Sequence, residues 1–296
     1  MDLAEYQRRA RRTSRLTDSD EAFLVGLLGL AGETGSLLTE YKKRLRDGPA
    51  HHGHQSAMAE ELGDVLWYVA EIASCCGIDL NEAALQNLAK NADRWGSSGE
   101  DEELPSAIAT VLYDEGFPQS EQLPRKFRIR VFEDHRSSPP TIALHLGRRR
   151  VGDVLTDNAY DDDGYRFHDV FHLGYAAILG WSPVLRKLLG CKRKSDLLAD
   201  RVEDGGRAIV VEEGIAAFIY GYAKKHDYLR TIKHLDTEVL RTVKNMTEGL
   251  EVSSRTAHDW ERAIIDGFRV WRQVREHKGG AVVVDLNRRS VRYERP

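Results

Sequence analysis

The chain has 296 residues, a formal net charge of −4 at pH 7, 41% hydrophobic residues and 30% charged residues. This composition is that of a soluble globular protein with one large or two ordinary domains. The small net charge excludes a general attraction to nucleic acid or to an anionic membrane. No apolar run approaches the roughly 20 residues that a membrane helix needs, and the basic N-terminus lacks the apolar segment of a signal peptide.

Three cysteines are present, at Cys75, Cys76 and Cys191, which is an odd number without the spacing of a metal site. We expect them to be reduced thiols, as in the cytoplasm. The sequence therefore predicts a cytoplasmic protein with no membrane partner and no specific nucleic-acid partner.

Residues 3–95 are expected to be almost wholly helical. A long helix is predicted from about residue 20 to 46 and a second from about 56 to 76, since glycines follow both segments. A third helix is predicted over "LNEAALQNLAKNADRW", residues 80–95. Apolar residues recur with a 3.6-residue period in these segments, so we expect the helices to pack as a bundle.

The segment "GSSGEDEEL" is small, polar and acidic, which is typical of a linker between domains. We therefore expect a helical domain at residues 1–96, a linker at 97–104 and a second domain at 105–296.

The second domain is predicted to combine helices with a small sheet. "KFRIRVFE" alternates polar and apolar residues, and "TIALHLG" follows it after a Pro-Pro turn, which together favour a β-hairpin. "AVVVDLNRRSVRYE" at the C-terminus predicts another hairpin, and residues 164–278 between them return to a helical pattern. The expected fold class is mainly α: an N-terminal helical bundle, then an α+β domain whose antiparallel strands come from both ends of the domain.

Three acids stand out in the N-terminal bundle. Glu33 lies on the first long helix, and Glu61 and Asp64 lie three residues apart on the second, so the last two share a helix face. Carboxylates from two facing helices suit Mg²⁺, which neutralises phosphate charge and activates water. Gly63 costs roughly 1 kcal/mol relative to Ala inside a helix, so it indicates close approach of another helix or of a ligand.

The third helix carries polar and basic residues suited to a polyphosphate. Asn87, Lys90 and Arg94 follow one another at spacings of three and four, which places them on one stripe of the helix. Amide, ammonium and guanidinium groups all donate hydrogen bonds to phosphate oxygens.

The segments "GLAGETGSL", "KKRLRDG", "EELGDVLWYVAEIA", "GIDL" and "NLAKNADRW" resemble the MazG-type all-α nucleoside triphosphate pyrophosphohydrolases. The resemblance covers about residues 20–96, one third of the chain, with the segments in the family's order. It implies Mg²⁺-dependent hydrolysis of a nucleoside triphosphate to monophosphate and pyrophosphate, with Mn²⁺ as an alternative ion. It also implies a homodimer or larger homo-oligomer.

The resemblance assigns expected roles to individual residues. The family has an ExxE motif on one helix and an ExxD motif on the next, which hold the metal and form the catalytic site. Bundle residues, Trp67 among them, are expected to contact the base. The matching positions are Glu33 for the first acid of ExxE, Glu61 and Asp64 for ExxD, and Asn87, Lys90 and Arg94 for the phosphate-side helix.

The chain departs from this pattern at Ser36, where the family has its second Glu. One unit of negative charge is therefore missing, and metal affinity should fall because ligand charge helps to determine it. Glu40, one turn further along, and Glu60 are candidates to compensate. Two alternatives stay open at this point: an active enzyme, or a weakened domain that senses nucleotides.

A second cluster lies in the C-terminal domain. His168, Asp169 and His172 form an HDxxH arrangement, with the two histidines on one helix face. Glu212 and Glu213 lie in an otherwise apolar segment, and buried acids need partners or a metal. The alternatives are a structural histidine pair and a second site with its own metal-dependent chemistry.

Overall fold

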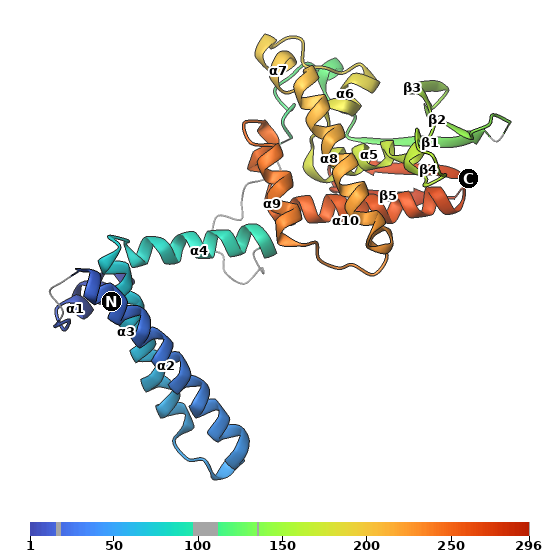
Figure 1. Ribbon diagram of the computed structural model, residues 1–296. Helices are drawn as coiled ribbons and strands as arrows, with labels where there is room; N and C mark the ends of the chain where they lie inside the picture. The colour runs from blue at the N-terminus through green and yellow to red at the C-terminus, as the bar shows by residue number, and fades with distance from the viewer. Residues whose placement is uncertain (16–18, 97–111, 135, 296) are drawn as a thin grey trace. The chain divides into compact units, whose positions relative to one another are not determined.

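The computed structural model describes residues 1–15, 19–96, 112–134 and 136–295 (Figure 1). The chain divides into two compact units, Met1–Ala92 and Asp93–Pro296. The division falls just before the domain boundary predicted at residue 96. The predicted linker, residues 97–104, lies outside the described residues.

The first unit is helical throughout. α2 and α3 run side by side as an antiparallel hairpin, and α1 packs on α3 (Figure 1). The three helices predicted for this region are confirmed, with ends that shift by one or two residues. The elements are α1 (Leu3–Arg11), α2 (Ser19–Asp47), the 3-10 turn η1 (Gly48–Ala50), α3 (His54–Cys75) and α4 (Leu80–Trp95).

A glycine sets the distance between α2 and α3. A Cβ atom at Gly29 would lie 2.1 Å from Cε1 of Tyr68, so only glycine allows this tyrosine to lie against the α2 backbone. Gly29 precedes Glu33 by one helical turn, and Tyr68 follows Asp64 by one turn. This contact therefore holds the two helices together next to the predicted acids.

Much of the apolar surface of α2 is exposed. Leu24, Leu28, Leu38 and Leu45 are 57%, 65%, 65% and 69% exposed. By length and composition alone, the stretch Glu21–Ala50 could cross a membrane, and only 11% of its apolar window is buried in the structure. Exposed apolar patches of this kind mark interaction surfaces.

The second unit contains a five-stranded antiparallel sheet with strand order β3-β2-β1-β4-β5. β1 pairs with β2 on one side and with β4 on the other, in the register Ile129↔Leu146 and Ile129↔Val282. The prediction that both ends of the domain contribute strands is confirmed, whereas β3 was not predicted. The strands are β1 (Lys126–Asp134), β2 (Thr141–Leu146), β3 (Arg149–Leu155), β4 (Gly279–Asp285) and β5 (Ser290–Glu294).

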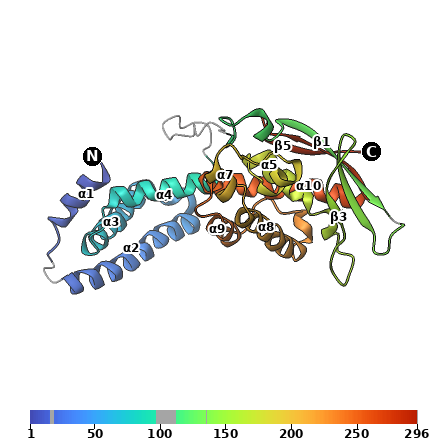
Figure 2. The ribbon, with the colours of Figure 1, turned by 90° about the horizontal axis from the view of Figure 1, so that it is seen from above.

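Helices of the second unit cover the sheet. α5 and α10 pack against β4 and β5 (Figure 2). The two helices cross closely, because a Cβ at Gly174 would lie 3.2 Å from both the Ala263 carbonyl oxygen and the Gly267 Cα. Every residue of α5 is buried. The helices are α5 (Asp169–Leu179), α6 (Pro183–Leu189), α7 (Leu197–Val202), α8 (Gly206–Lys224), α9 (Thr237–Met246) and α10 (Ala257–Glu276), with 3-10 turns η2 (Gln119–Glu121), η3 (Tyr165–Phe167), η4 (Asp227–Leu229) and η5 (Glu251–Ser254).

Buried ion pairs join separate segments of the second unit. Arg186 Nη2 lies 2.7 Å from Asp114 Oδ2, and both side chains are 1% exposed. Arg193 Nη2 lies 2.8 Å from Asp204 Oδ1 and 2.7 Å from Glu251 Oε1. Such pairs are costly to break, because the remaining partner is left as an uncompensated buried charge.

Candidate active site

The structure brings together the three acids predicted in the N-terminal unit. One carboxylate oxygen from each of Glu33, Glu61 and Asp64 lies within 4.8 Å of the others. Glu33 comes from α2, whereas Glu61 and Asp64 lie one turn apart on α3. Glu33 and Glu61 are half-buried and Asp64 is exposed, so the cluster is open to solvent.

The electrostatics of this cluster suit a cation. Burial raises the pKa of the Glu61 carboxyl, and the negative charges of Glu33 and Asp64 raise it further. Like charges held this close disfavour ionisation of one another. A divalent cation would relieve that repulsion, and its preferred ligands are oxygens. The donor set therefore fits Mg²⁺.

Ser36 and Glu40 lie further along α2. Ser36 is half-buried, and Glu40 is 7% exposed. Glu40 lies close enough to Glu61 to raise its pKa, although its own oxygens pair with Lys43 and, at 3.2 Å, with His51 Nε2. Glu40 is therefore a neighbour of the acid cluster whose charge is partly neutralised by other residues.

Among the described residues of the first unit, no hydrogen bond or ion pair joins Asn87 or Lys90 of α4 to the three acids. Asn87 and Lys90 are exposed, and Asn87 Oδ1 accepts a hydrogen bond of 3.0 Å from Asn91. Arg94 belongs to the second unit, where Nη1 lies 3.0 Å from Glu261 Oε2 and Nη2 donates to the Leu235 carbonyl at 2.8 Å. The spacing correctly predicted that these residues lie on one helix, but it could not predict the contacts of Arg94 with Glu261 and Leu235.

Two further positions on α3 lie near the acids. Trp67, one turn beyond Asp64, donates from Nε1 to Thr13 Oγ1 at 2.8 Å and meets the Tyr68 ring edge-on at 5.0 Å. Apart from its own helix backbone and chain neighbours, no atom of the described residues lies within 4 Å of the position that a Cβ would occupy at Gly63. We expected Gly63 to allow close approach of either another helix or a ligand. The described residues place no other helix against it.

The second cluster is also assembled by the fold. His168, Asp169 and His172 each offer a ligand atom within 4.8 Å of the others. Glu213 of α8 faces them, with Oε2 3.4 Å from His172 Nε2 and 3.8 Å from His168 Nε2. His168 lies just before α5 and His172 within it, so α5 and α8 form the two sides of this cluster.

Glu212 is fully buried and supports this cluster from behind. Its Oε1 accepts hydrogen bonds from His172 Nδ1 at 2.8 Å and from Ser182 Oγ at 2.7 Å, and its Oε2 accepts from the Val184 amide at 2.8 Å. Burial alone would lower the pKa of His172, but Glu212 and Glu213 outweigh it and raise the pKa to about 10. Ser182 could not be predicted as part of this cluster, because its hydrogen bond to Glu212 joins residues 30 positions apart.

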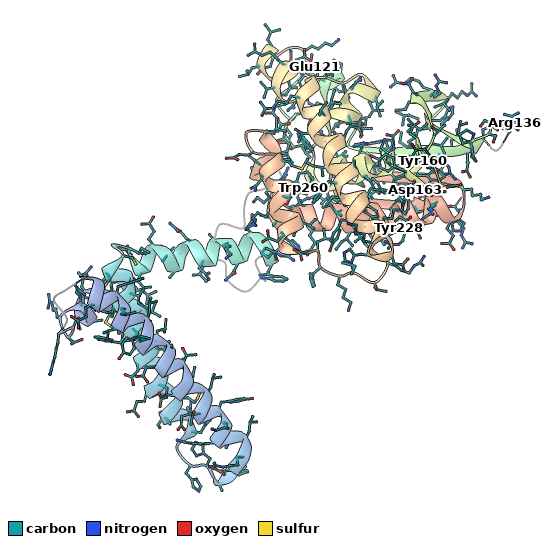
Figure 3. The ribbon with its side chains drawn as sticks, viewed as in Figure 1. Glu121, Arg136, Tyr160, Asp163, Tyr228 and Trp260 are labelled. Carbon is teal, nitrogen blue, oxygen red and sulfur yellow. The ribbon has the colours of Figure 1, made fainter. Side chains whose placement is uncertain are left out.

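The loop before α5 is tied to α8. Asp163, labelled in Figure 3, accepts from the Tyr165 amide at 3.0 Å and from Lys224 Nζ at 3.1 Å. The Tyr220 hydroxyl donates to the Asp163 carbonyl at 2.7 Å. These bonds place Tyr165 so that its ring stacks on His168 at a centroid distance of 4.6 Å. Asp163 thus helps to position His168.

Taken together, an all-α hairpin that carries a three-carboxylate cluster and a separate α+β unit define the class of this protein. Its N-terminal part matches the model of the MazG nucleotide pyrophosphohydrolase domain over residues 25–96. Residues 108–296 match the model of the MazG C-terminal domain. The chain belongs to the MazG family, as the resemblance predicted, and the C-terminal match covers residues for which no resemblance had been found.

Three curated proteins are similar to the N-terminal part. The Gene 37 protein of Mycobacterium phage L5 is 37% identical over 79 residues, which are 26% of this chain and 69% of that protein. The dCTP pyrophosphatase 1 proteins of Rattus norvegicus and Mus musculus are each 36% identical over 73 residues, 23% of this chain. The match spans 43% of the length of the two pyrophosphatases. No solved structure matches the chain significantly.

Proposed function

We propose that this chain hydrolyses nucleoside triphosphates to monophosphate and pyrophosphate at Glu33, Glu61 and Asp64. The observation that carries the proposal is the convergence of these three carboxylates from α2 and α3 within a MazG nucleotide pyrophosphohydrolase domain. Because the relatives from rat and mouse are dCTP pyrophosphatases, dCTP is the first substrate to test.

The three acids would hold Mg²⁺, with Mn²⁺ as the alternative ion. When bound, such an ion neutralises phosphate charge and lowers the pKa of a coordinated water. The acids project from two packed helices, so their positions are set before substrate binds. Trp67, one turn from Asp64, is the proposed contact for the base, and the open position at Gly63 leaves space for a ligand.

A homo-oligomer is part of the proposal. Asn87 and Lys90 are exposed and make no contact with the acids of their own chain among the described residues. A second copy could supply these groups to the phosphates. The exposed leucines of α2 support such an assembly, since burying them between copies would remove apolar surface from water.

An intracellular location is also proposed. All three cysteines, Cys75, Cys76 and Cys191, are free, as expected for thiols in a reducing compartment. Glu33 lies in the middle of α2 and contributes to the acid cluster, which favours contact of this helix with water and protein over lipid.

Replacement of one acid tests the proposal. Glu61→Gln keeps the size of the side chain and removes its charge, so pyrophosphate release from dCTP should fall by at least about 100-fold, or roughly 2.7 kcal/mol of barrier. The measurement is pyrophosphate released from a panel of nucleoside triphosphates with Mg²⁺ or Mn²⁺.

The matched control is Glu82→Gln, an exposed acid at the start of α4 that should leave the rate unchanged. Loss of pyrophosphate release in His172→Gln with full activity in Glu61→Gln would contradict the proposal and move the chemistry to the C-terminal unit.

Ser36 favours a second candidate function. Without the second acid of the family's ExxE motif, the domain would bind metal-bound nucleotides without hydrolysing them efficiently. Nucleotide binding would then act as a signal to the C-terminal unit. Nucleotide binding by the wild-type chain without release of pyrophosphate, measured by calorimetry alongside the activity panel, would support this candidate.

A further inference from the structure

Four side chains of metal-ligating types lie together in the second unit: His168, Asp169 and His172 each offer an atom within 4.8 Å of the others, and Glu213 faces the two histidines. His172 Nε2 lies 3.4 Å from Glu213 Oε2, which in turn lies 3.8 Å from His168 Nε2. His168 Nε2 is 3.6 Å from Asp169 Oδ1. Two ligand atoms that each lie about 2.1 Å from one ion at a tetrahedral angle are about 3.4 Å apart. The observed separations are therefore close to those around a shared ion.

Each histidine is oriented through its other ring nitrogen. His172 Nδ1 is bound to Glu212 Oε1 at 2.8 Å, and His168 Nδ1 to the Tyr165 carbonyl at 2.9 Å. A carbonyl can only accept, so Nδ1 of His168 is the donor to it, and Nε2 is the ring nitrogen that faces the cluster. A carboxylate or carbonyl behind a ligating histidine is the arrangement that orients metal ligands in proteins.

The Nε2 atom of His172 makes no hydrogen bond among the described residues, although the side chain is 1% exposed, and it faces the Glu213 Oε2 atom at 3.4 Å. A buried polar nitrogen with a charged neighbour but no well-formed hydrogen bond is not fully satisfied, and natural proteins usually satisfy such atoms. This nitrogen points towards Glu213, on the side where His168 and Asp169 also lie. An ion at that position would satisfy it.

We propose that the MazG C-terminal domain of this chain holds a divalent transition-metal ion through His168, Asp169, His172 and Glu213. The mixture of imidazole and carboxylate ligands suits Zn²⁺ and, with more coordination positions, Mn²⁺ or Fe²⁺. Mg²⁺ prefers oxygen ligands in octahedral geometry, so this site differs in chemistry from the acids of α2 and α3.

The proposed metal site is open to solvent on the Glu213 side and closed by buried residues on the Glu212 side. The Glu213 side chain is 40% exposed, whereas Glu212 behind His172 is fully buried. An ion could therefore enter past Glu213 and keep one position for water or a ligand. Glu212 is a positioning residue, because it contacts His172 and not the ion.

The test uses the full chain with Glu61→Gln and His51→Gln, which remove the acid cluster and the Glu40, His51 and His54 group as competing sites. After chelation and removal of the chelator, titration with Zn²⁺ should show one bound ion per chain by calorimetry and by metal analysis. Glu213→Gln and His168→Gln in the same background should each weaken Zn²⁺ binding at least tenfold. Glu212→Gln should weaken it 10- to 100-fold, as for other residues that orient metal ligands.

The matched control is Glu238→Gln, an exposed acid on α9 that should leave binding unchanged. Glu213 is partly exposed, so its variant should keep the fold, and circular dichroism of each metal-free variant verifies this. Absence of Zn²⁺ and Mn²⁺ binding in this double-variant background would overturn the proposal. Binding that survives in both Glu213→Gln and His168→Gln, or Mg²⁺ that competes as well as Zn²⁺, would also overturn it.

Discussion

At the scale of single residues, Ser36 is expected to weaken the cation binding proposed for the N-terminal site. It follows Glu33 by three residues on α2, and side chains at that spacing are neighbours on a helix. A hydroxyl offers one neutral oxygen, whereas a carboxylate offers charge and two oxygens. The nearby Glu40 does not replace this charge fully, because Lys43 and His51 already bind its oxygens.

Restoring the acid should strengthen the site. Ser36→Glu is expected to tighten Mg²⁺ binding by about tenfold, or roughly 1.4 kcal/mol, because it adds one charged ligand. The measurement is the Mg²⁺ concentration that gives half-maximal pyrophosphate release, together with direct calorimetry. Ser36→Gln is the control of equal length without the charge, and an equal gain in both variants would show that charge is not the cause.

Individual site residues could be predicted where their relation is local. Glu61 and Asp64 are three residues apart on one helix, and the HDxxH histidines are four apart, so helix geometry alone places each pair on one face. The hydrogen bond from Ser182 to Glu212 spans 30 residues, and no sequence pattern indicates it. The same holds for the pairing of Arg94 with Glu261.

At the scale of elements, the exposed apolar face of α2 is the surface proposed to bind a second copy of the chain. Leu28→Glu places a charge on a side chain that is 65% exposed within one chain. The expected result is dissociation of the proposed homo-oligomer with an intact helical fold, because the monomer does not bury this position. Light scattering after size-exclusion chromatography, with circular dichroism, measures both properties.

The control is Leu197→Glu, since Leu197 at the start of α7 is 83% exposed and lies in the second unit. This variant should keep the oligomer. A wild-type chain that is monomeric at all concentrations would contradict the proposal.

The sequence pattern predicted three helices of the N-terminal unit and four of the five strands, and its failures have physical causes. β1 alternates between exposed and buried residues, which is the pattern that a half-buried strand needs. β3 begins with charged residues, contains Gly152 in a left-handed conformation and pairs with β2 through an irregular register, so no clean alternation marks it. The sequence of β3 therefore does not look like a strand, and its strand conformation depends on pairing with β2.

At the scale of the whole molecule, the buried ion pairs make stability of the second unit depend on pH. Burial alone would raise the pKa of Asp114, but the Leu123 amide, Arg186 and Arg125 outweigh it and lower the pKa below its usual value. A carboxyl with a lowered folded-state pKa stabilises the fold above its unfolded value of about 3.9. That stabilisation is lost as the pH falls through the folded-state pKa.

Asp114→Asn should therefore destabilise the second unit by about 3 kcal/mol near neutral pH, because Arg186 is left buried without its charged partner. It should also remove part of the stability loss that the wild type shows below about pH 4. Thermal unfolding followed between pH 3 and pH 8 measures both effects. Asp227→Asn, at a carboxyl that is 68% exposed, is the control and should change neither.

Gly29 influences the size of the N-terminal acid cluster, because it lets α2 approach α3 closely. The Tyr68 ring occupies the space of a side chain at this position, so the separation between α2 and α3 is set by contact of a ring with bare backbone. That separation helps to set how far Glu33 stands from Glu61 and Asp64, and would therefore limit the radius of the ion that the proposed site could hold. Discrimination between cations of different size then depends on cavity dimensions. In this chain the spacing of the three acids, and with it the size of the proposed site, depends on Gly29, which has no side chain to bind an ion.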